Sequence, residues 1–367
     1  MKRFGILLVI VALITAYLLL WPVPFEPVIW KPAAAPSADA YPDNDQLRNI
    51  ERLADGTGIG PEGIAVDLKG QIYAGYADGR VMRFDEDGAH PVLLANTGGR
   101  PLGISVGDKG VFVADARRGL LQIKADGSVV VLSTGADGKP FRFVDDVAQS
   151  PVDPYLYFTD ASARFGIDQL MVDVLEHGDT GRLLRYDPAT GQTKTLMQGL
   201  HFANGVAVGP GASYLLVSET NEYRIWRYWL KGVRAGQQEI FADNLPGFPD
   251  NLSIDDGHVW QALYAPRNAA LDAIADRPTL RKLAYRLPKF LRPKPALRSW
   301  VLAFDLNGKR VHDLQYGGDP VDSDAPKPYG PITSVREIGG TLYFGSLSDT
   351  AIGRLVLPTT EVNAAAP

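Results

Sequence analysis

Four oxygen-bearing side chains occupy the same position in a motif that recurs along the chain. They are Glu62 in GPEGIAVD, Asp145 in FVDDVAQ, Asn204 in FANGVAV and Asp250 in FPDNLSI. Carboxylate and amide oxygens without Cys or His form a hard ligand set that suits calcium, or less well magnesium or manganese. Like charges brought together in a partly desolvated site favour a bound cation. We therefore expect these side chains to form a divalent-metal site.

The residues next to these positions extend the candidate site. Asn251 follows Asp250 and adds a further metal ligand, while Asp146 follows Asp145 and adds a carboxylate. A single Asp or Asn at such a position is more often a turn former, but the common phase of several favours a shared site. The two remaining openings, RPLGISV and GPITSVR, carry apolar residues at the first position, Leu102 and Ile332.

The elements that position these residues are short strands. After GPEGIAVD come QIYAGYADG and RVMRFDEDG, and the same order recurs five times. Aromatic and β-branched runs between Gly, Asp and Asn turns predict strands and hairpins, and a period of roughly 40 residues with several strands indicates propeller blades. We therefore predict an all-β fold, a six-bladed β-propeller whose first strands surround a central channel. The last repeat lacks an outermost strand, which Leu47–Leu53 is expected to supply.

The N-terminus predicts a membrane anchor. Lys2 and Arg3 precede an apolar run, Phe4–Trp21, which is long enough to cross a bilayer and is not followed by a small-residue cleavage site. The basic residues should stay cytoplasmic, which places the remainder outside the cytoplasm, in a periplasmic, lumenal or extracellular space. We expect an anchor at 1–30, a linker at 31–44, the propeller at 45–358 and a tail at 359–367.

The composition excludes several kinds of chemistry. A net charge of −5 gives no basic domain for nucleic acid. The chain has no Cys, so a thiol nucleophile and a cysteine-based metal site are both excluded. With 46% hydrophobic residues, 38 Gly and 27 Pro, the chain reads as a globular fold rich in turns.

Two connections between second and third strands are enlarged, at 162–181 and 266–298, and both should cover the channel mouth. The second is rich in Arg and Lys among apolar residues. That pattern fits a lid with a solvated face, a contact with the membrane surface or a site for an anionic partner, and these alternatives stay open. His177 in the first insertion and His201 before the Asn204 turn are each placed to approach a substrate, and we include His201 as a catalytic candidate.

The motif openings and the run from Gly199 to Gly232, followed by FADNLPGFPDNLS, resemble the strictosidine synthase-like family, above all its membrane-anchored branch. More distantly, the chain is similar to the gluconolactonase/regucalcin and paraoxonase families. The resemblance covers about 45–358. It implies a six-bladed propeller and, from the lactonase and paraoxonase branches, a catalytic calcium or other divalent ion in the channel. By motif it matches their metal ligands to Glu62, Asp145–Asp146, Asn204 and Asp250.

The departures from these families carry information as well. Asp145 replaces their usual Asn, which adds negative charge to the site. Leu102 stands where paraoxonases have a His, so histidine-based proton transfer is disfavoured. The stretch Gly330–Val335 has no carboxylate where strictosidine synthase uses a Glu for condensation, since Glu337 lies further along the strand.

These observations lead to one expectation and two alternatives. We expect a membrane-anchored, calcium-dependent hydrolase of small-molecule lactones or esters, in which the ion polarises the carbonyl and stabilises the oxyanion. Asp145, Asp146 or Asp250 would activate water. The first alternative is a non-enzymatic, surface-anchored binding propeller with a structural ion. The second is a synthase that forms a carbon–nitrogen bond, which the missing glutamate disfavours.

Overall fold

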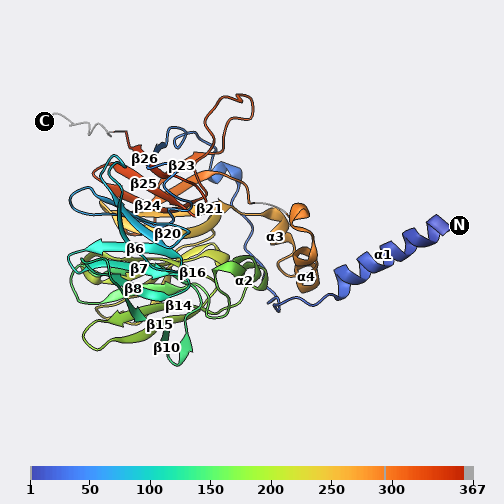
Figure 1. The fold of residues 1–367 in the computed structure, drawn as a ribbon, viewed down its shortest axis with the longest axis horizontal. Helices are drawn as coiled ribbons and strands as arrows, with labels where there is room; N and C mark the ends of the chain where they lie inside the picture. Colours follow the sequence, from blue (N-terminus) through green and yellow to red (C-terminus); the bar gives the residue numbers. More distant parts are fainter. Residues whose placement is uncertain (1, 293–294, 359–367) are drawn as a thin grey trace.

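Six four-stranded antiparallel sheets follow one another around a central channel (Figure 1). The computed structural model describes residues 2–292 and 295–358. The first three blades comprise β2 (Ile64–Val66), β3 (Ile72–Gly75), β4 (Arg80–Phe84) and β5 (Val92–Asn96); β6 (Pro101–Gly107), β7 (Gly110–Asp115), β8 (Gly119–Ile123) and β9 (Val129–Ser133); and β12 (Val144–Gln149), β13 (Leu156–Asp160), β14 (Gly181–Asp187) and β15 (Gln192–Leu200). The next three comprise β16 (Ala203–Val208), β17 (Tyr214–Glu219), β18 (Arg224–Trp229) and β19 (Gln238–Ala242); β20 (Gly247–Asp255), β21 (His258–Pro266), β22 (Ser299–Phe304) and β23 (Arg310–Tyr316); and β24 (Ile332–Ile338), β25 (Thr341–Ser346), β26 (Ile352–Val356) and β1 (Glu51–Leu53). The predicted six-bladed propeller is confirmed.

The sixth blade is completed by the other end of the chain. β1 pairs antiparallel with β26, with Glu51 opposite Arg354 and Leu53 opposite Ile352. Leu47 lies buried among the apolar residues of blades five and six. The expected closure by Leu47–Leu53 is therefore present, and the outer edge of the last blade is paired instead of open.

The hydrophobic core lies between neighbouring blades. Alternate residues of each strand face the adjacent sheet, as strand geometry requires: Tyr73 and Val81 of blade one pack with Ile104 and Val113 of blade two. A small hairpin, β10 (Gly135–Ala136) with β11 (Lys139–Pro140), extends the loop before β12. Because every blade packs on two others, the first strands are held rigidly around the channel.

The α-helices of the described residues lie on one side of the propeller (Figure 1). α2 (Leu170–Glu176) belongs to the blade-three insertion, and α3 (Ala269–Ala273) and α4 (Pro278–Arg286) belong to the blade-five insertion. The side chain of Asn268 caps α3 by accepting hydrogen bonds from the backbone amides of Ala270 and Leu271. α1 (Lys2–Leu20) projects away from the molecule on this side, and Arg3–Leu20 is apolar and long enough to cross a membrane.

The segment predicted as a linker, 31–44, packs along blade five. Arg267 donates to the carbonyl of Ala33 at 2.9 Å, and the side chain of Asn44 accepts from the amide of Gln315 at 2.9 Å. Its Ala and Pro content suggested a spacer, but these backbone contacts give it a fixed course. The predicted tail at 359–367 lies outside the described residues.

Candidate functional site

A repeated irregularity in the first strands directs the predicted ring towards the axis. In blades two to six, the register of the first strand shifts at the ring position, as between Val144 and Val147 or between Ala203 and Val206. Such a bulge breaks the strict alternation of the strand and turns neighbouring side chains into new directions. Asp145 and Asn204 lie within these bulges and line the channel cavity.

Carboxylates at the ends of the second strands hold the bulges in place. Asp115 accepts a hydrogen bond from the backbone amide of Arg100 at 3.0 Å, and Asp160 accepts one from Phe143 at 3.0 Å. Glu219 accepts one from His201 at 2.7 Å. These charge-assisted bonds each contribute about 1.5–3 kcal/mol. They fix the start of each first strand and therefore the residues that follow it.

The ring is assembled as predicted in five blades and shifted in the sixth. Glu62, Leu102, Asp145, Asn204 and Asp250 all line the same cavity. In blade six the lining residue is Thr333, whereas Ile332 is fully buried in the apolar core. Ile332 pairs with Ser346 just as Val144 pairs with Asp160, so Thr333 is the structural equivalent of Asp145. The sequence alignment of GPITSVR was therefore wrong by one residue.

Several side-chain oxygens of the ring have no hydrogen-bond partner among the described residues. Asn251 donates from its side chain to Glu62 Oε1 at 2.7 Å. Glu62 Oε2, Asn204 Oδ1 and Asn251 Oδ1 are buried and have no hydrogen-bond partner among the described residues. Buried polar atoms are rarely left unpaired. Converging carboxylate and amide oxygens fit a hard divalent cation such as calcium, and these residues therefore suit the ion implied by the resemblance.

The electrostatics of the ring also favour a cation. Burial raises the pKa of Glu62 to about 8, and the neighbouring Asp146 charge adds to the shift while Arg100 opposes it. Burial, followed by repulsion from Glu62, raises the pKa values of Asp145 and Asp250 well above the ordinary range. Without a cation, the cluster therefore resists full ionisation.

Arg100 lies beside the ring, a neighbour that the sequence analysis did not name. Its guanidinium is buried, donates to the carbonyl of Gly60 at 3.0 Å and lies close enough to lower the pKa of Glu62. Arg100 is the first residue of the blade-two opening RPLGISV and lies two positions before Leu102. Its place in this motif was the signal in the sequence. It places one positive charge beside the acidic ring.

Asp146 takes a different place from Asp145. Its Oδ1 accepts from the backbone amide of Val147 at 2.8 Å and its Oδ2 from that of Val206 at 2.9 Å. It lies outside the cavity lining, where it joins blade three to blade four. A Cβ on Gly103 would lie 2.3 Å from Asp146 Oδ1, so glycine permits this close approach. The geometry gives Asp146 a structural task and leaves Asp145 and Asp250 at the cavity.

Above the ring, the cavity has a volume of about 530 Å³ and mostly apolar walls. Both insertions contribute to it, as the sequence predicted for the channel mouth. The apolar residues around it come from first strands and lids: Phe143, Phe202, Phe248, Ile167, Leu170, Met171, Val174, Leu175, Leu271 and Ile274. Blade six adds Thr333 and Leu347. Glu337 lies elsewhere and accepts from the indole of Trp260 at 2.6 Å.

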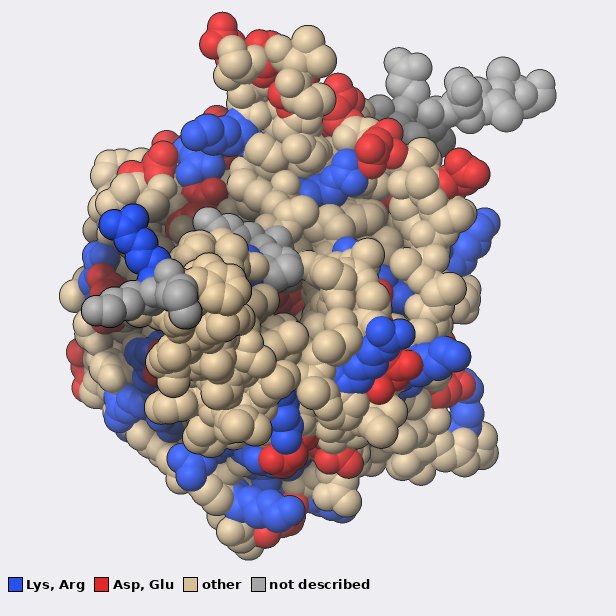
Figure 2. Space-filling view, turned by 90° about the vertical axis from the view of Figure 1, so that its right-hand side faces the viewer, with Lys and Arg blue, Asp and Glu red and all other residues tan. Residues whose placement is uncertain are grey.

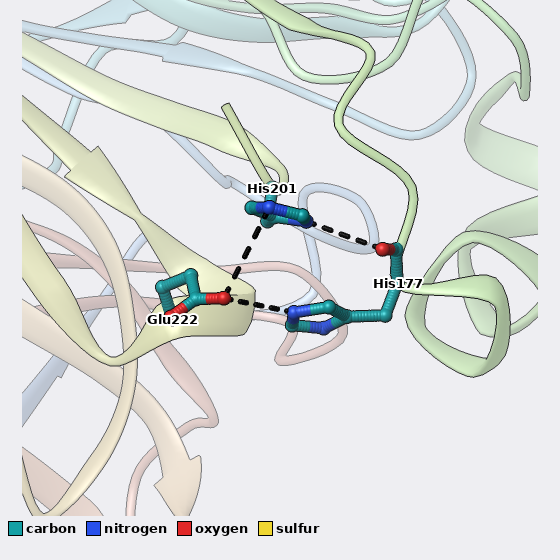
Figure 3. A group of neighbouring side chains, drawn as sticks. All are labelled: His177, His201 and Glu222. Atoms are coloured by element: carbon teal, nitrogen blue, oxygen red, sulfur yellow. Dashed lines mark hydrogen bonds and ion pairs between the residues drawn. The ribbon is translucent and has the colours of Figure 1, made fainter. Parts of the chain in front are cut away.

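His177 and His201 form a separate cluster beside the cavity (Figure 3). His177 Nε2 donates to Glu222 Oε1 at 2.9 Å, and His201 Nε2 lies 4.0 Å from the same oxygen. Burial lowers the pKa of His177, which favours the neutral ring. Trp30 stacks on the ring of His177 with centroids 4.0 Å apart. The cluster thus joins the end of α2 to blade four and to the segment that follows α1.

The same cluster brings one ligand atom from each of its residues within 4.8 Å of the others, a spacing that a metal ion can bridge. The rings of His177 and His201, however, stack nearly parallel, with 21° between their planes. An ion in the plane of one ring would lie out of the plane of the other. Arg224 also lies 3.7 Å from Glu222 Oε2. The axial ring therefore fits a cation better than this cluster.

Comparisons with known proteins place this architecture in a family. The strictosidine synthase family matches residues 145–233, and the N-terminal family of strictosidine synthase-like proteins matches 39–84. Strictosidine synthase-like protein 7 of Arabidopsis thaliana is 37% identical over 97% of this chain and 96% of its own length. The chain belongs to the strictosidine synthase-like family. Human adipocyte plasma membrane-associated protein, 33% identical over 86% of this chain and 79% of its own length, is another relative.

Solved structures agree on the fold of this family member. A gluconolactonase from Xanthomonas campestris superposes with a TM-score of 0.59 at 18% identity, over 92% of this chain and 99% of its own. Regucalcin from Agrobacterium tumefaciens, described as a calcium-binding protein, gives 0.57 at 15% identity, over 83% and 93%. At these identities the likeness establishes the propeller fold alone.

Proposed function

We propose that this protein is a divalent-metal-dependent hydrolase of lactones or esters. The observation that carries the proposal is a set of buried oxygens without a hydrogen-bond partner among the described residues: those of Glu62 and Asn204, which line an apolar cavity of about 530 Å³, and that of Asn251, which is bonded to Glu62. Glu62, Asp145, Asn204, Asp250 and Asn251 would hold the ion. Bound calcium would polarise the substrate carbonyl and stabilise the negative charge that develops on its oxygen.

The residues of the ring divide the remaining tasks. We assign Asp145 to take up a proton from the attacking water. Asp250 already accepts a hydrogen bond from the backbone amide of Asn251 at 3.0 Å, and Asp146 lies outside the cavity lining. The water oxygen bonds to the carbonyl carbon, the carbon–oxygen bond of the ester breaks, and the leaving alkoxide takes up the proton that Asp145 accepted, which gives an acid and an alcohol from an ester or a hydroxy acid from a lactone. The apolar walls orient the substrate and exclude bulk water. His201 is not among the described residues that line the cavity, and its ring contacts the carbonyl of His177 in the blade-three insertion, so we assign it to positioning.

The alternatives remain distinct in their expected behaviour. The family name refers to a synthase, but the cavity residues of blade six, Thr333 and Leu347, supply no carboxylate for condensation chemistry. A binding propeller with a structural ion would lose stability on chelation without any turnover to lose.

Hydrolysis of a panel of lactones and aryl esters by the purified full chain tests the proposal, with calcium, manganese or magnesium supplied after chelation. We expect turnover that chelation abolishes and one of these ions restores. If chelation lowers the melting temperature while no panel member is hydrolysed under any condition, the hydrolase proposal is wrong and the binding propeller is favoured.

We further propose that α1 anchors the protein with its N-terminus in the cytoplasm. Lys2 and Arg3 precede the span, and short basic flanks of this kind are retained on the cytoplasmic side. The propeller and its cavity then lie on the opposite side of the membrane. Protection of the propeller from protease added to the cytoplasmic face would support this orientation, and its digestion there would refute it.

A further inference from the structure

The membrane anchor is fastened to the lid of the cavity. Arg286 at the end of α4 is buried and donates from Nε to the carbonyl of Trp21 at 2.6 Å and from Nη1 to that of Leu18 at 2.9 Å. Leu18 lies in the last turn of α1 and Trp21 directly follows the helix, where backbone carbonyls have no intrahelical donor. A buried cation at this helix end is favourable.

The segment that follows α1 is fixed by further contacts. Phe25 is buried against Phe165, Val172 and Leu175 of the blade-three lid. Lys282 of α4 pairs with Glu26 at 2.7 Å. α1 therefore leaves the protein at a defined point beside α4, and a bilayer that contains α1 must lie against the lids.

The turn after α4 exposes large apolar side chains at this point. Phe290 is 81% exposed and the adjacent Leu291 is 57% exposed, and we call this pair the apolar edge. Arg292 follows it and bonds back to the carbonyl of Leu287 at 2.8 Å. An exposed aromatic and aliphatic pair next to a basic residue is typical of side chains that enter the bilayer interface. Figure 2 shows that the centre of this face is mainly uncharged, with both basic and acidic residues around it.

The mouth of the cavity lies in the same stretch of chain. Ala284 of α4 and Arg292 line the cavity, and they flank the apolar edge on both sides in the sequence. We propose that the apolar edge is a second membrane contact, which rests in the interface of the bilayer that α1 spans. The mouth then faces the lipid, and a substrate with a long apolar chain enters the cavity directly from the bilayer. This last step rests on the proposed function, whereas the contact itself does not.

The absence of cysteine in the chain permits a direct test with single labels. Phe290→Cys or Leu291→Cys, labelled with an environment-sensitive fluorophore, is reconstituted as the full chain into vesicles of phosphatidylcholine and phosphatidylglycerol that contain a lipid-borne quencher. The matched control is Leu68→Cys. Leu68 is fully exposed and lies in the turn between β2 and β3, which follows the end of β2 opposite to Glu62.

We expect the lipid-borne quencher to reduce the fluorescence at 290 and 291 by about twofold or more and to leave the label at 68 unchanged. If the labels at 290 and 291 are quenched by aqueous iodide as strongly as that at 68, and not by the lipid, the contact does not exist.

A second experiment uses the double variant Phe290→Glu, Leu291→Glu. Its hydrolysis of a vesicle-borne long-chain ester should fall about tenfold, while that of a soluble short-chain ester stays unchanged. If no ester is hydrolysed at all, the hydrolase proposal fails and the quenching result still decides the contact.

Discussion

The side chain of Asn251 in blade five donates a 2.7 Å hydrogen bond to the carboxylate of Glu62 in blade one, although 189 residues separate them. The bond joins two blades that blade six separates in the ring, and one oxygen on each side chain has no partner among the described residues. Both residues are buried. The two free oxygens are therefore held at fixed positions before any ligand arrives, as a preorganised cation site requires.

Metal binding should reverse the response of stability to pH. The pKa of Glu62 is raised to about 8 and those of Asp145 and Asp250 are also raised. In chelated protein the folded state therefore binds more protons than the unfolded state, and stability is lost as the pH rises from about 4 to 8. Calcium binds the ionised carboxylates, so its stabilising effect should grow over the same range, to about 3–4 kcal/mol at 100 to 1,000 times Kd.

Melting temperatures at pH 5 to 8, with chelator or with calcium, measure this effect. Glu62→Gln is the control, because it removes one titrating group and should flatten the difference. A calcium effect of equal size at pH 5 and pH 8 would contradict the assignment of the ring as the ligand set.

Substitution of Asp145 should lower the rate of hydrolysis, whereas substitution of its neighbour Asp146 should lower the stability of the fold. Asp145→Asn should lower kcat/KM by about 10²-fold or more, because the proton acceptor is removed. Asp146→Asn should leave the rate within about threefold but lower stability by about 1–3 kcal/mol, because an amide NH₂ would face a backbone amide. Steady-state kinetics and denaturant unfolding of both variants test this, and the opposite pattern would exchange the two roles.

The contact between His177 and Glu222 should control the mobility of the blade-three lid. His177 has a left-handed backbone, with φ of 56°, which Asn tolerates. His177→Asn removes the stacking with Trp30 and the bond to Glu222. A loss of about 1–2 kcal/mol should speed amide exchange in α2 by about 5- to 30-fold. His90→Asn is a matched control, since His90 has φ of 49° and is exposed. Unchanged exchange in α2 would mean that the lid is held by other contacts.

Leu47 should contribute to stability despite its place at the start of the propeller. It is buried among residues of blades five and six, so Leu47→Ala should reduce the free energy of unfolding by about 2–4 kcal/mol. Leu68→Ala, at a fully exposed position, should have almost no effect. Chemical denaturation compares the two, and equal stabilities would show that the closing segment adds little.

The sequence was sufficient for the blade order and for most of the ring, because a repeat assigns equivalent residues to equivalent places. Glu62, Asp145, Asn204 and Asp250 share a motif phase and meet at one cavity. The alignment was wrong by one residue at Ile332, where GPITSVR lacks the Glu, Asp or Asn that marks four of the other openings.

Other features depend on which neighbour a side chain faces, and the repeat does not encode this. The bulges turn Asp146 towards Val206 of the next blade and away from the cavity. Burial of Arg100 beside Glu62 and the fixed course of the segment at 31–44 both depend on contacts between residues far apart in the chain. Local composition does not reveal these contacts, so the segment at 31–44 was predicted to be a linker.

The pairing of β1 with β26 has a consequence for the order in which the protein matures. Glu51 and Arg354 are 303 residues apart, and they close the ring as opposite residues of two strands. The strand next to the anchor is made first, yet its partner is made last. During synthesis the ring therefore stays open until β26 has been made and can pair with β1, so closure of the ring is the last step of folding.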